Sequence, residues 1–244
     1  MKTSTLKKIL LSFALIASSL QAAGESKPNI IFILVDDMGY SDLGCYGGEV
    51  QTPNLDHLAE QGMRFTQMYN TSKCFPSRAC LLTGVYAQQC NMGHRGASNS
   101  DGKIKNAVTL GEVLRTAGYR TLASGKHHGT ENLYDRGFDH YYGLRQGASN
   151  MWNPGGVTRE GEMTPGRKAI PRPFCIDEEI IEPYTPPIGW YATDAFTDYA
   201  LKWLDEPECE EQPFFLYLSY TAPHYPLHAW PEDIAKYKGR YDAG

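Results

Sequence analysis

Four short groups of residues carry side chains that can do chemistry. They are Asp36-Asp37, Cys74-Phe75-Pro76-Ser77-Arg78, Gly125-Lys126-His127-His128 and Ala222-Pro223-His224-Tyr225-Pro226. Between them they offer carboxylates, a thiol nucleophile, fixed cations and imidazoles that can transfer protons. Because the groups are spread over about 190 residues, they can act together only if the fold brings them to one place.

The apolar pattern predicts strands that would do so. A continuous β-branched run at residues 29–35 stops at the aspartate pair, which is typical of a strand buried on both faces of a sheet. Short strands are predicted at 63–68 and 119–123, and another buried strand at 214–220. Ligands of open parallel sheets sit beyond the carboxyl ends of the strands. We therefore expect the aspartate pair, the Lys126 group and the His224 group to converge.

Helices are predicted between the strands, at residues 54–61, 109–117 and 191–204. A further helix begins near Pro76-Ser77, because proline favours the first helical turn. The N-terminus of that helix would favour an anion close to Cys74. This alternation indicates an α/β fold in which a mostly parallel sheet is sandwiched by helices.

Residues 143–190 interrupt the alternation. Glycine and proline recur there and the periodic apolar pattern is lost, so we expect a long loop or insertion, a frequent place for substrate selection. Four aromatic residues in or beside it either stack on sugar rings or anchor the loop to the core. They are Tyr141, Tyr142, Trp152 and Trp190.

Residues 1–23 have the pattern of a cleaved signal peptide. Lysines at positions 2, 7 and 8 precede an apolar run from Ile9 to Leu20, and small residues follow at Ala22 and Ala23. The alternative is a membrane anchor, but about a dozen apolar residues is short of the roughly 20 that span a bilayer. We expect an exported protein, periplasmic or secreted, in which residues 24–244 have no stable membrane insertion.

The net charge argues against nucleic-acid binding, and the cysteine content bears on disulfide formation. The formal net charge of −5 becomes −8 without the three lysines of residues 1–23, and no basic patch of the kind that binds nucleic acid is present. Attraction of an anionic substrate must therefore be local. The chain has six cysteines and no Cys-x-x-Cys motif, so disulfides are possible in an oxidising compartment but their connectivity cannot be read.

The four groups, in this order, resemble the motifs of the formylglycine-dependent type I sulfatases in the alkaline-phosphatase-like superfamily. The segment from Cys74 to Arg78, followed by Leu81-Leu82-Thr83-Gly84, is similar to the signature whose cysteine is oxidised to formylglycine. The resemblance covers nearly all of residues 24–244 but only the N-terminal portion of the family's usual catalytic domain. It implies a C-terminally truncated sulfatase-like fold and hydrolysis of sulfate esters, on a sulfated carbohydrate or an aryl sulfate.

The resemblance also implies a cofactor and a partner. Asp36, Asp37 and residue 74 would bind one divalent cation, most often Ca²⁺, which prefers oxygen ligands. Cys74 would be oxidised by a formylglycine-generating, sulfatase-maturating enzyme. The hydrated aldehyde carries two hydroxyls, of which one attacks sulfur while deprotonation of the other expels sulfate.

Catalytic roles follow from the same resemblance. Arg78 would neutralise the nucleophile, Lys126 would contact the formylglycine or the sulfate, and His128 would assist proton removal. His224 would contact a sulfate oxygen or protonate the leaving alcohol. The chain has His127 where the family usually has tryptophan, so either histidine can face the site, and the register favours His128.

Each group also has a plain structural interpretation. The aspartates can cap a strand, Cys74 can be a buried or bridged thiol, and the charged and imidazole side chains can be solvated or lie in turns. The family's later Asp-Asn or Asp-His pair and second lysine do not occur between His224 and Gly244, so we expect little activity from residues 1–244 alone. Two other functions stay open: a phosphonate or phosphate ester hydrolase of the same superfamily, and an inactive fragment that keeps an anion-binding remnant.

Overall fold

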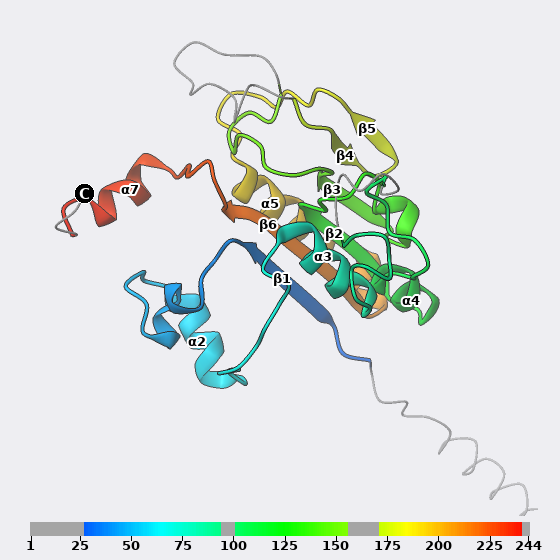
Figure 1. Ribbon diagram of the computed structural model, residues 1–244, viewed down its shortest axis with the longest axis horizontal. Coiled ribbons are helices and arrows are strands. Elements are labelled where there is room, and N and C mark those ends of the chain that lie inside the picture. Colours follow the sequence, from blue (N-terminus) through cyan, green and yellow to red (C-terminus); the bar gives the residue numbers. More distant parts are fainter. Residues whose placement is uncertain (1–26, 94–100, 156–170, 241–244) are drawn as a thin grey trace, which may run out of the picture.

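The computed structural model describes residues 27–93, 101–155 and 171–240, so the predicted signal peptide lies outside the described residues (Figure 1). Its centre is a six-stranded sheet in the order β1-β6-β2-β3-β4-β5. The strands are β1 (Ile30–Asp36), β2 (Arg120–Gly125), β3 (His140–Leu144), β4 (Phe174–Ile176), β5 (Glu179–Ile181) and β6 (Phe214–Pro223). The first four strands in this order are parallel, and β4 and β5 extend the sheet antiparallel. The mostly parallel sheet is confirmed.

Helices cover both faces of this sheet, as predicted. The helices are α2 (Pro53–Gln61), α3 (Cys74–Thr83), α4 (Leu110–Thr116), α5 (Ala192–Leu204), α6 (Pro207–Glu211) and α7 (Pro231–Tyr237), with 3-10 turns η1 (Tyr40–Asp42), η2 (Gly44–Tyr46) and η3 (Tyr134–Arg136). Alternate residues of β6 divide the core: Leu216 packs with α5, whereas Phe215 lies on the side of α3 and α4. This period-two alternation is what a sheet between two helical layers requires.

The strand β1 differs from the prediction in its burial. Ile30, Phe32 and Leu34 pack against the core on the side of α3 and α4. On the opposite face Ile31 and Ile33 are 53% and 48% exposed, so β1 is covered on one face only. An uninterrupted apolar run is compatible with burial of both faces of a strand. Whether a helix covers the second face depends on tertiary packing, and no helix of the described residues covers Ile31 and Ile33.

One predicted strand and one predicted helix start were wrong. Residues 63–68 form no strand and are exposed at Met63, Phe65 and Met68, because no neighbouring strand of the described residues pairs with them. The helix α3 begins at Cys74 rather than near Pro76-Ser77. Proline is tolerated there because the N–H groups of a first helical turn have no intrahelical acceptor.

The segment 143–190 is more ordered than a long loop where the structure describes it. The short strands β4 and β5 lie within it, and β3, which was not predicted, ends at Leu144. The nearby aromatic residues anchor this region: the rings of Tyr142 and Tyr199 stack 3.6 Å apart, and Trp190 Nε1 donates a 3.0 Å hydrogen bond to Tyr142 Oη. Residues 156–170 of the predicted loop lie outside the described residues.

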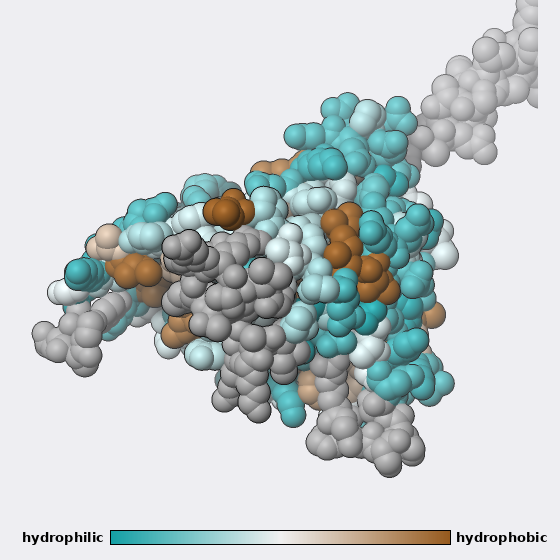
Figure 2. Space-filling model, turned by 90° about the horizontal axis from the view of Figure 1, so that it is seen from above, coloured by the Kyte–Doolittle hydropathy of each residue, from teal (hydrophilic) through white to brown (hydrophobic). Residues whose placement is uncertain are grey.

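Figure 2 shows one mostly hydrophilic face with hydrophobic residues gathered in separate groups. Within the described ranges no helix is both long and apolar enough to cross a membrane.

Candidate active site

Three neighbouring strands end at one edge of the sheet, and the predicted polar groups follow them. Asp36 ends β1, Lys126 follows the last residue of β2, and His224 follows the last residue of β6. Because β6 lies between β1 and β2, residues far apart in the chain become neighbours here. Ser219 of β6 is aligned with Leu34 of β1 and Gly125 of β2, which places it at the centre of this edge.

A buried cluster of three charges lies at the edge. The Asp36 carboxylate accepts a hydrogen bond from Lys126 Nζ through Oδ2, and its Oδ1 lies 3.2 Å from Arg78 Nη2. Asp36 is 4% exposed, and Arg78 and Lys126 are each 1% exposed. Arg78 also donates to the Lys126 carbonyl at 2.7 Å and to Ser219 Oγ. One carboxylate therefore stands against two fixed cations, which leaves the cluster with a net positive charge.

The pKa values of this cluster are shifted from their ordinary values. Burial alone would raise the pKa of Asp36, but the charges of Arg78 and Lys126 outweigh it and lower that pKa. Burial, together with the charge of Arg78, lowers the pKa of Lys126, and the attraction of Asp36 opposes this only in part. Groups with shifted pKa values beside a pocket are typical of a functional site.

A pocket with a volume of about 380 Å³ opens next to the cluster. Asp36, Asp37, Cys74 and Arg78 all line it. Cys74 is the first residue of α3 and Arg78 is one turn further on, so both side chains reach the same pocket from one helical face. The N-terminus of α3 adds a positive partial charge close to Cys74.

The second aspartate and the last histidine lie at the rim of this region. Asp37 has a left-handed backbone with φ of 65°, and its side chain is 61% exposed. His224 Nε2 lies 3.5 Å from Asp37 Oδ2. His224 is therefore close to Asp37, which lines the pocket, but His224 itself is not one of the lining residues.

The two adjacent histidines point to different places. His128 packs its imidazole against the ring of Phe75, with centroids 5.7 Å apart, and Phe75 is in the first turn of α3. His127 is fully buried and lies 3.5 Å from Glu131 Oε1, away from the pocket. Neither histidine is among the residues that line the pocket, so the choice of His128 by register stays a prediction.

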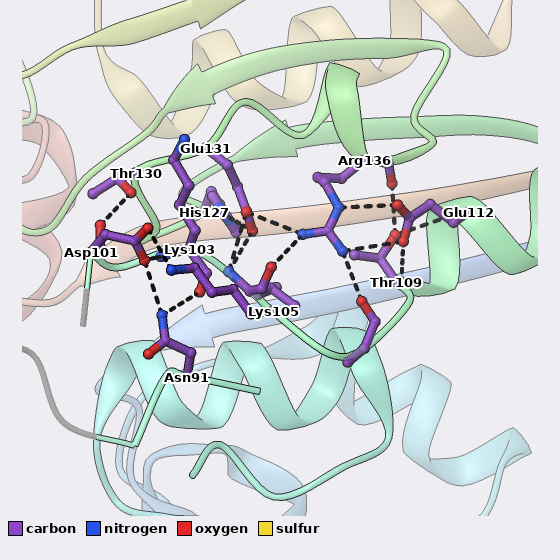
Figure 3. A network of polar contacts seen from close by, with 12 residues as sticks. Asn91, Asp101, Lys103, Lys105, Thr109, Glu112, His127, Thr130, Glu131 and Arg136 are labelled. Atoms are coloured by element: carbon purple, nitrogen blue, oxygen red, sulfur yellow. Dashed lines mark hydrogen bonds and ion pairs between the residues drawn. The ribbon is translucent and has the colours of Figure 1, made fainter. Parts of the chain in front are cut away.

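His127 belongs to a separate network that Figure 3 draws. Glu131 and Glu112 both pair with Arg136, at 3.1 and 3.0 Å, and Arg136 also donates to the carbonyls of Ile104 and Ala107. Burial lowers the pKa of His127, so its imidazole is neutral at pH 7 and Arg136 supplies the counter-charge for Glu131. This network fastens the segment before α4 to the segment that follows Lys126.

We expect Arg136→Gln to destabilise the protein by about 2–3 kcal/mol, because it leaves Glu131 buried without a counter-charge. Burial alone would raise the pKa of Glu131, but His127 and Arg136 outweigh it and hold that pKa below 4.5. The contribution of Glu131 is therefore present above pH 4.5 and is lost as the pH falls through the folded pKa.

Urea unfolding at pH 7 and at pH 3 measures both effects. The matched control is Arg115→Gln, since Arg115 is 57% exposed in its ion pair with Asp139 and should cost less than about 1 kcal/mol. Equal stability of the two variants at pH 7 would contradict the role given to Arg136.

The donor set for a divalent cation is partial. Asp36 and Asp37 line the pocket together with Cys74, and carboxylate oxygens suit Ca²⁺. Both oxygens of Asp36 already contact cations, however, and the described residues contain no group of three His, Cys, Asp or Glu side chains arranged to hold a metal. The described residues thus bring two carboxylates and Cys74 to one pocket without forming a metal site.

Two residues of this region, Ser219 and Phe75, were not predicted from the sequence. Ser219 accepts from Arg78 and donates to the Lys126 carbonyl at 2.9 Å, and it is fully buried. A polar residue inside the apolar run of β6 was the available signal. Phe75, at the variable position after Cys74, has no signal in its type or spacing, because its contact with His128 depends on the tertiary fold.

Comparison with known proteins gives a consistent result. The Sulfatase family model matches residues 28–244. The arylsulfatase of Klebsiella aerogenes is 35% identical to this chain, over 94% of this chain and 50% of the arylsulfatase. Human arylsulfatase A is also 35% identical, over 87% of this chain and 44% of its own length.

Solved structures agree in fold. Ps i-CgsB, solved in complex with k-i-k-neocarrahexaose, superposes with a TM-score of 0.72 at 33% identity, covering 89% of this chain and 50% of its own. BT4656, solved in complex with its substrate D-glucosamine-2-N,6-O-disulfate, gives a TM-score of 0.67 at 30% identity. The match covers 87% of this chain and 38% of BT4656.

The fold and the strand-end site define an α/β protein of the alkaline-phosphatase-like kind. The chain belongs to the sulfatase family. It spans about half the length of the curated relatives that it matches.

Proposed function

We propose that this protein hydrolyses sulfate esters, with residue 74 as the nucleophile after its oxidation to formylglycine. The observation that carries the proposal is the position of Cys74. It is the first residue of α3, it lines the pocket, and it lies beside the buried cluster of Asp36, Arg78 and Lys126. A nucleophile and fixed cations around one small pocket suit an ester of a strong acid, whose charge stays on the reacting group.

The floor of the pocket is its buried side, where Asp36 and Arg78 line it and Lys126 lies against Asp36, and its electrostatics favour an anion. Among these buried groups two positive charges stand against one carboxylate, and burial strengthens their field because little water screens it. The second carboxylate of the pocket, Asp37, is 61% exposed and is therefore screened by water. The N-terminus of α3 acts in the same direction. A sulfate group near residue 74 would therefore be held locally, although the chain as a whole has a net charge of −5.

Different residues of the chain would then carry out different steps of the reaction. Arg78 is fixed by Ser219 and the Lys126 carbonyl, so it can offer its charge without reorganising. Lys126 would contact residue 74 or a sulfate oxygen, and His128 would accept a proton from residue 74. His224 would protonate the leaving alcohol or contact the sulfate. Formylglycine, once water has added to its aldehyde, would supply two hydroxyls on one carbon, one for attack and one for release of sulfate.

We also propose a divalent cation, with Ca²⁺ as the first choice. Asp36 and Asp37 would hold it together with residue 74, in line with the oxygen donors that they offer at the pocket. Such an ion would polarise sulfate oxygens and help to ionise the attacking hydroxyl. The adjacent carboxylates are the observation that supports this site.

The proposed substrate is a sulfated saccharide or an aryl sulfate. Two similar structures hold saccharide ligands, one of them a disulfated glucosamine, and two similar curated proteins are arylsulfatases. The pattern of residues 1–23 supports export to the periplasm or beyond, with a formylglycine-generating enzyme as the maturation partner.

The test is turnover of an aryl sulfate compared with the matching aryl phosphonate. The protein is expressed from its own gene together with a formylglycine-generating enzyme and assayed with added Ca²⁺. We expect kcat/KM for the sulfate to exceed that for the phosphonate by at least about tenfold, a difference of about 1.4 kcal/mol in transition-state stabilisation. A preference for the phosphonate would favour a phosphonate hydrolase, and binding of sulfate esters without turnover would favour an anion-binding remnant.

A further inference from the structure

One cation of the pocket has no counter-charge among the described residues. Asp36 is paired with Arg78 and Lys126, and Asp37 lies near His224. Lys73 also lines the pocket, and it forms no ion pair with any residue of the described ranges. Its charge is therefore available to a ligand.

Lys73 lies at the rim rather than on the floor. Its side chain is exposed, whereas Arg78 and Lys126 are each 1% exposed. The Lys73 ammonium stands 5.2 Å from the centroid of the Phe75 ring, which is itself 4% exposed and packed in a small core with Ala79 and Met92. The ring does not itself line the pocket, but it is a fixed support for the lysine cation through a cation–π contact.

The position of Lys73 is unfavourable for the helix that it precedes. It is the N-cap residue of α3, where Ser, Thr, Asp or Asn would normally accept a backbone hydrogen bond, and its side chain makes no cap. A positive charge at a helix N-terminus is also repelled by the helix dipole. Helix stability therefore does not account for a lysine at this position, which lies at the edge of the pocket.

We propose that Lys73 determines specificity by binding a second anionic group of the substrate, such as another sulfate or a carboxylate on the same saccharide. This inference rests on the proposed function, since it assumes that the reacting sulfate occupies the pocket floor. The buried cations would hold that reacting group, while Lys73 would hold the neighbouring anion at the rim. Saccharides with two or more anionic groups would be favoured over esters with a single sulfate.

Calorimetric titration with two defined probes tests the inference, on protein expressed without a formylglycine-generating enzyme so that Cys74 stays a thiol and the probes are not hydrolysed. D-glucosamine-2-N,6-O-disulfate has two sulfates, and N-acetylglucosamine-6-sulfate replaces the N-sulfate by an uncharged acetyl group. For Lys73→Gln we expect the Kd of the disulfate to rise by about fivefold or more, the size of an exposed ion pair, while the Kd of the monosulfate changes by less than about twofold. Lys73→Arg should retain most of the affinity for the disulfate.

The matched control is Lys202→Gln. Lys202 makes the same kind of contact, 5.5 Å from the ring centroid of Tyr199 on α5, and it does not line the pocket. Both titrations should be unchanged in this variant. An equal loss of both ligands in Lys73→Gln would mean that Lys73 holds the reacting sulfate, and no loss of either would mean that it holds none, so each result overturns the inference. Failure of the unmutated protein to bind any sulfate ester would instead overturn the proposed function.

Discussion

Replacing Cys74 with alanine is expected to reduce kcat for an aryl sulfate on the order of a thousandfold or more, because it removes the proposed nucleophile. Replacing it with serine should have a different outcome. Serine offers one hydroxyl, which can attack sulfur, but it lacks the second hydroxyl whose ionisation would release the sulfate. Cys74→Ser should therefore give at most one turnover per molecule.

Pre-steady-state measurement of released alcohol separates the two variants. A burst of no more than one equivalent is expected for Cys74→Ser and none for Cys74→Ala. The matched control is Cys209→Ala, since Cys209 lies on α6, away from the pocket, and should leave turnover unchanged. Sustained turnover by Cys74→Ala would exclude residue 74 as the nucleophile.

Asp36→Asn is expected to destabilise the protein by about 3–5 kcal/mol, the usual cost of removing one partner from a buried ion pair. Lys126 and Arg78 would be left facing each other in the core without a counter-charge, and burial already lowers the pKa of Lys126. Asp37→Asn is the matched control. The Asp37 side chain is 61% exposed, so its replacement should change stability by less than about 1 kcal/mol.

The measurement is the free energy of unfolding in urea at pH 7, without added divalent cations. Omitting the cation separates the ion cluster from any loss of metal binding, which would affect both variants. If the two variants were equally stable, the cluster of Asp36, Lys126 and Arg78 would not be the structural centre of the site.

Much of the fold could be predicted because local signals agree with it. The helix at 109–117 is bounded by a capping box of Thr109 and Glu112 and by Gly118 with φ of +83°, so its ends are fixed locally. The apolar run at 214–220 could be recognised as a buried strand, and β6 indeed lies inside the sheet, between β1 and β2. The strand-end rule then placed three polar groups at one edge.

The features that were missed depend on distant parts of the chain. The strands β4 and β5 have three residues each, too few for a periodic pattern. They form because the edge of β3 offers a partner to β4, and β4 in turn pairs with β5. The exposure of Ile31 follows from which helices reach β1, which its own sequence does not encode. Similarly, the motifs indicated charged residues, but not that Lys126 and Arg78 would share the carboxylate of Asp36.

The most direct test of the central claim is the chemical state of residue 74. The protein, expressed from its own gene with a formylglycine-generating enzyme, is digested and the peptide that contains residues 74–78 is examined by mass spectrometry and by reaction with a hydrazide. We expect an aldehyde at residue 74 that is lost in Cys74→Ala. A free thiol or a disulfide at Cys74 in fully matured protein would contradict it.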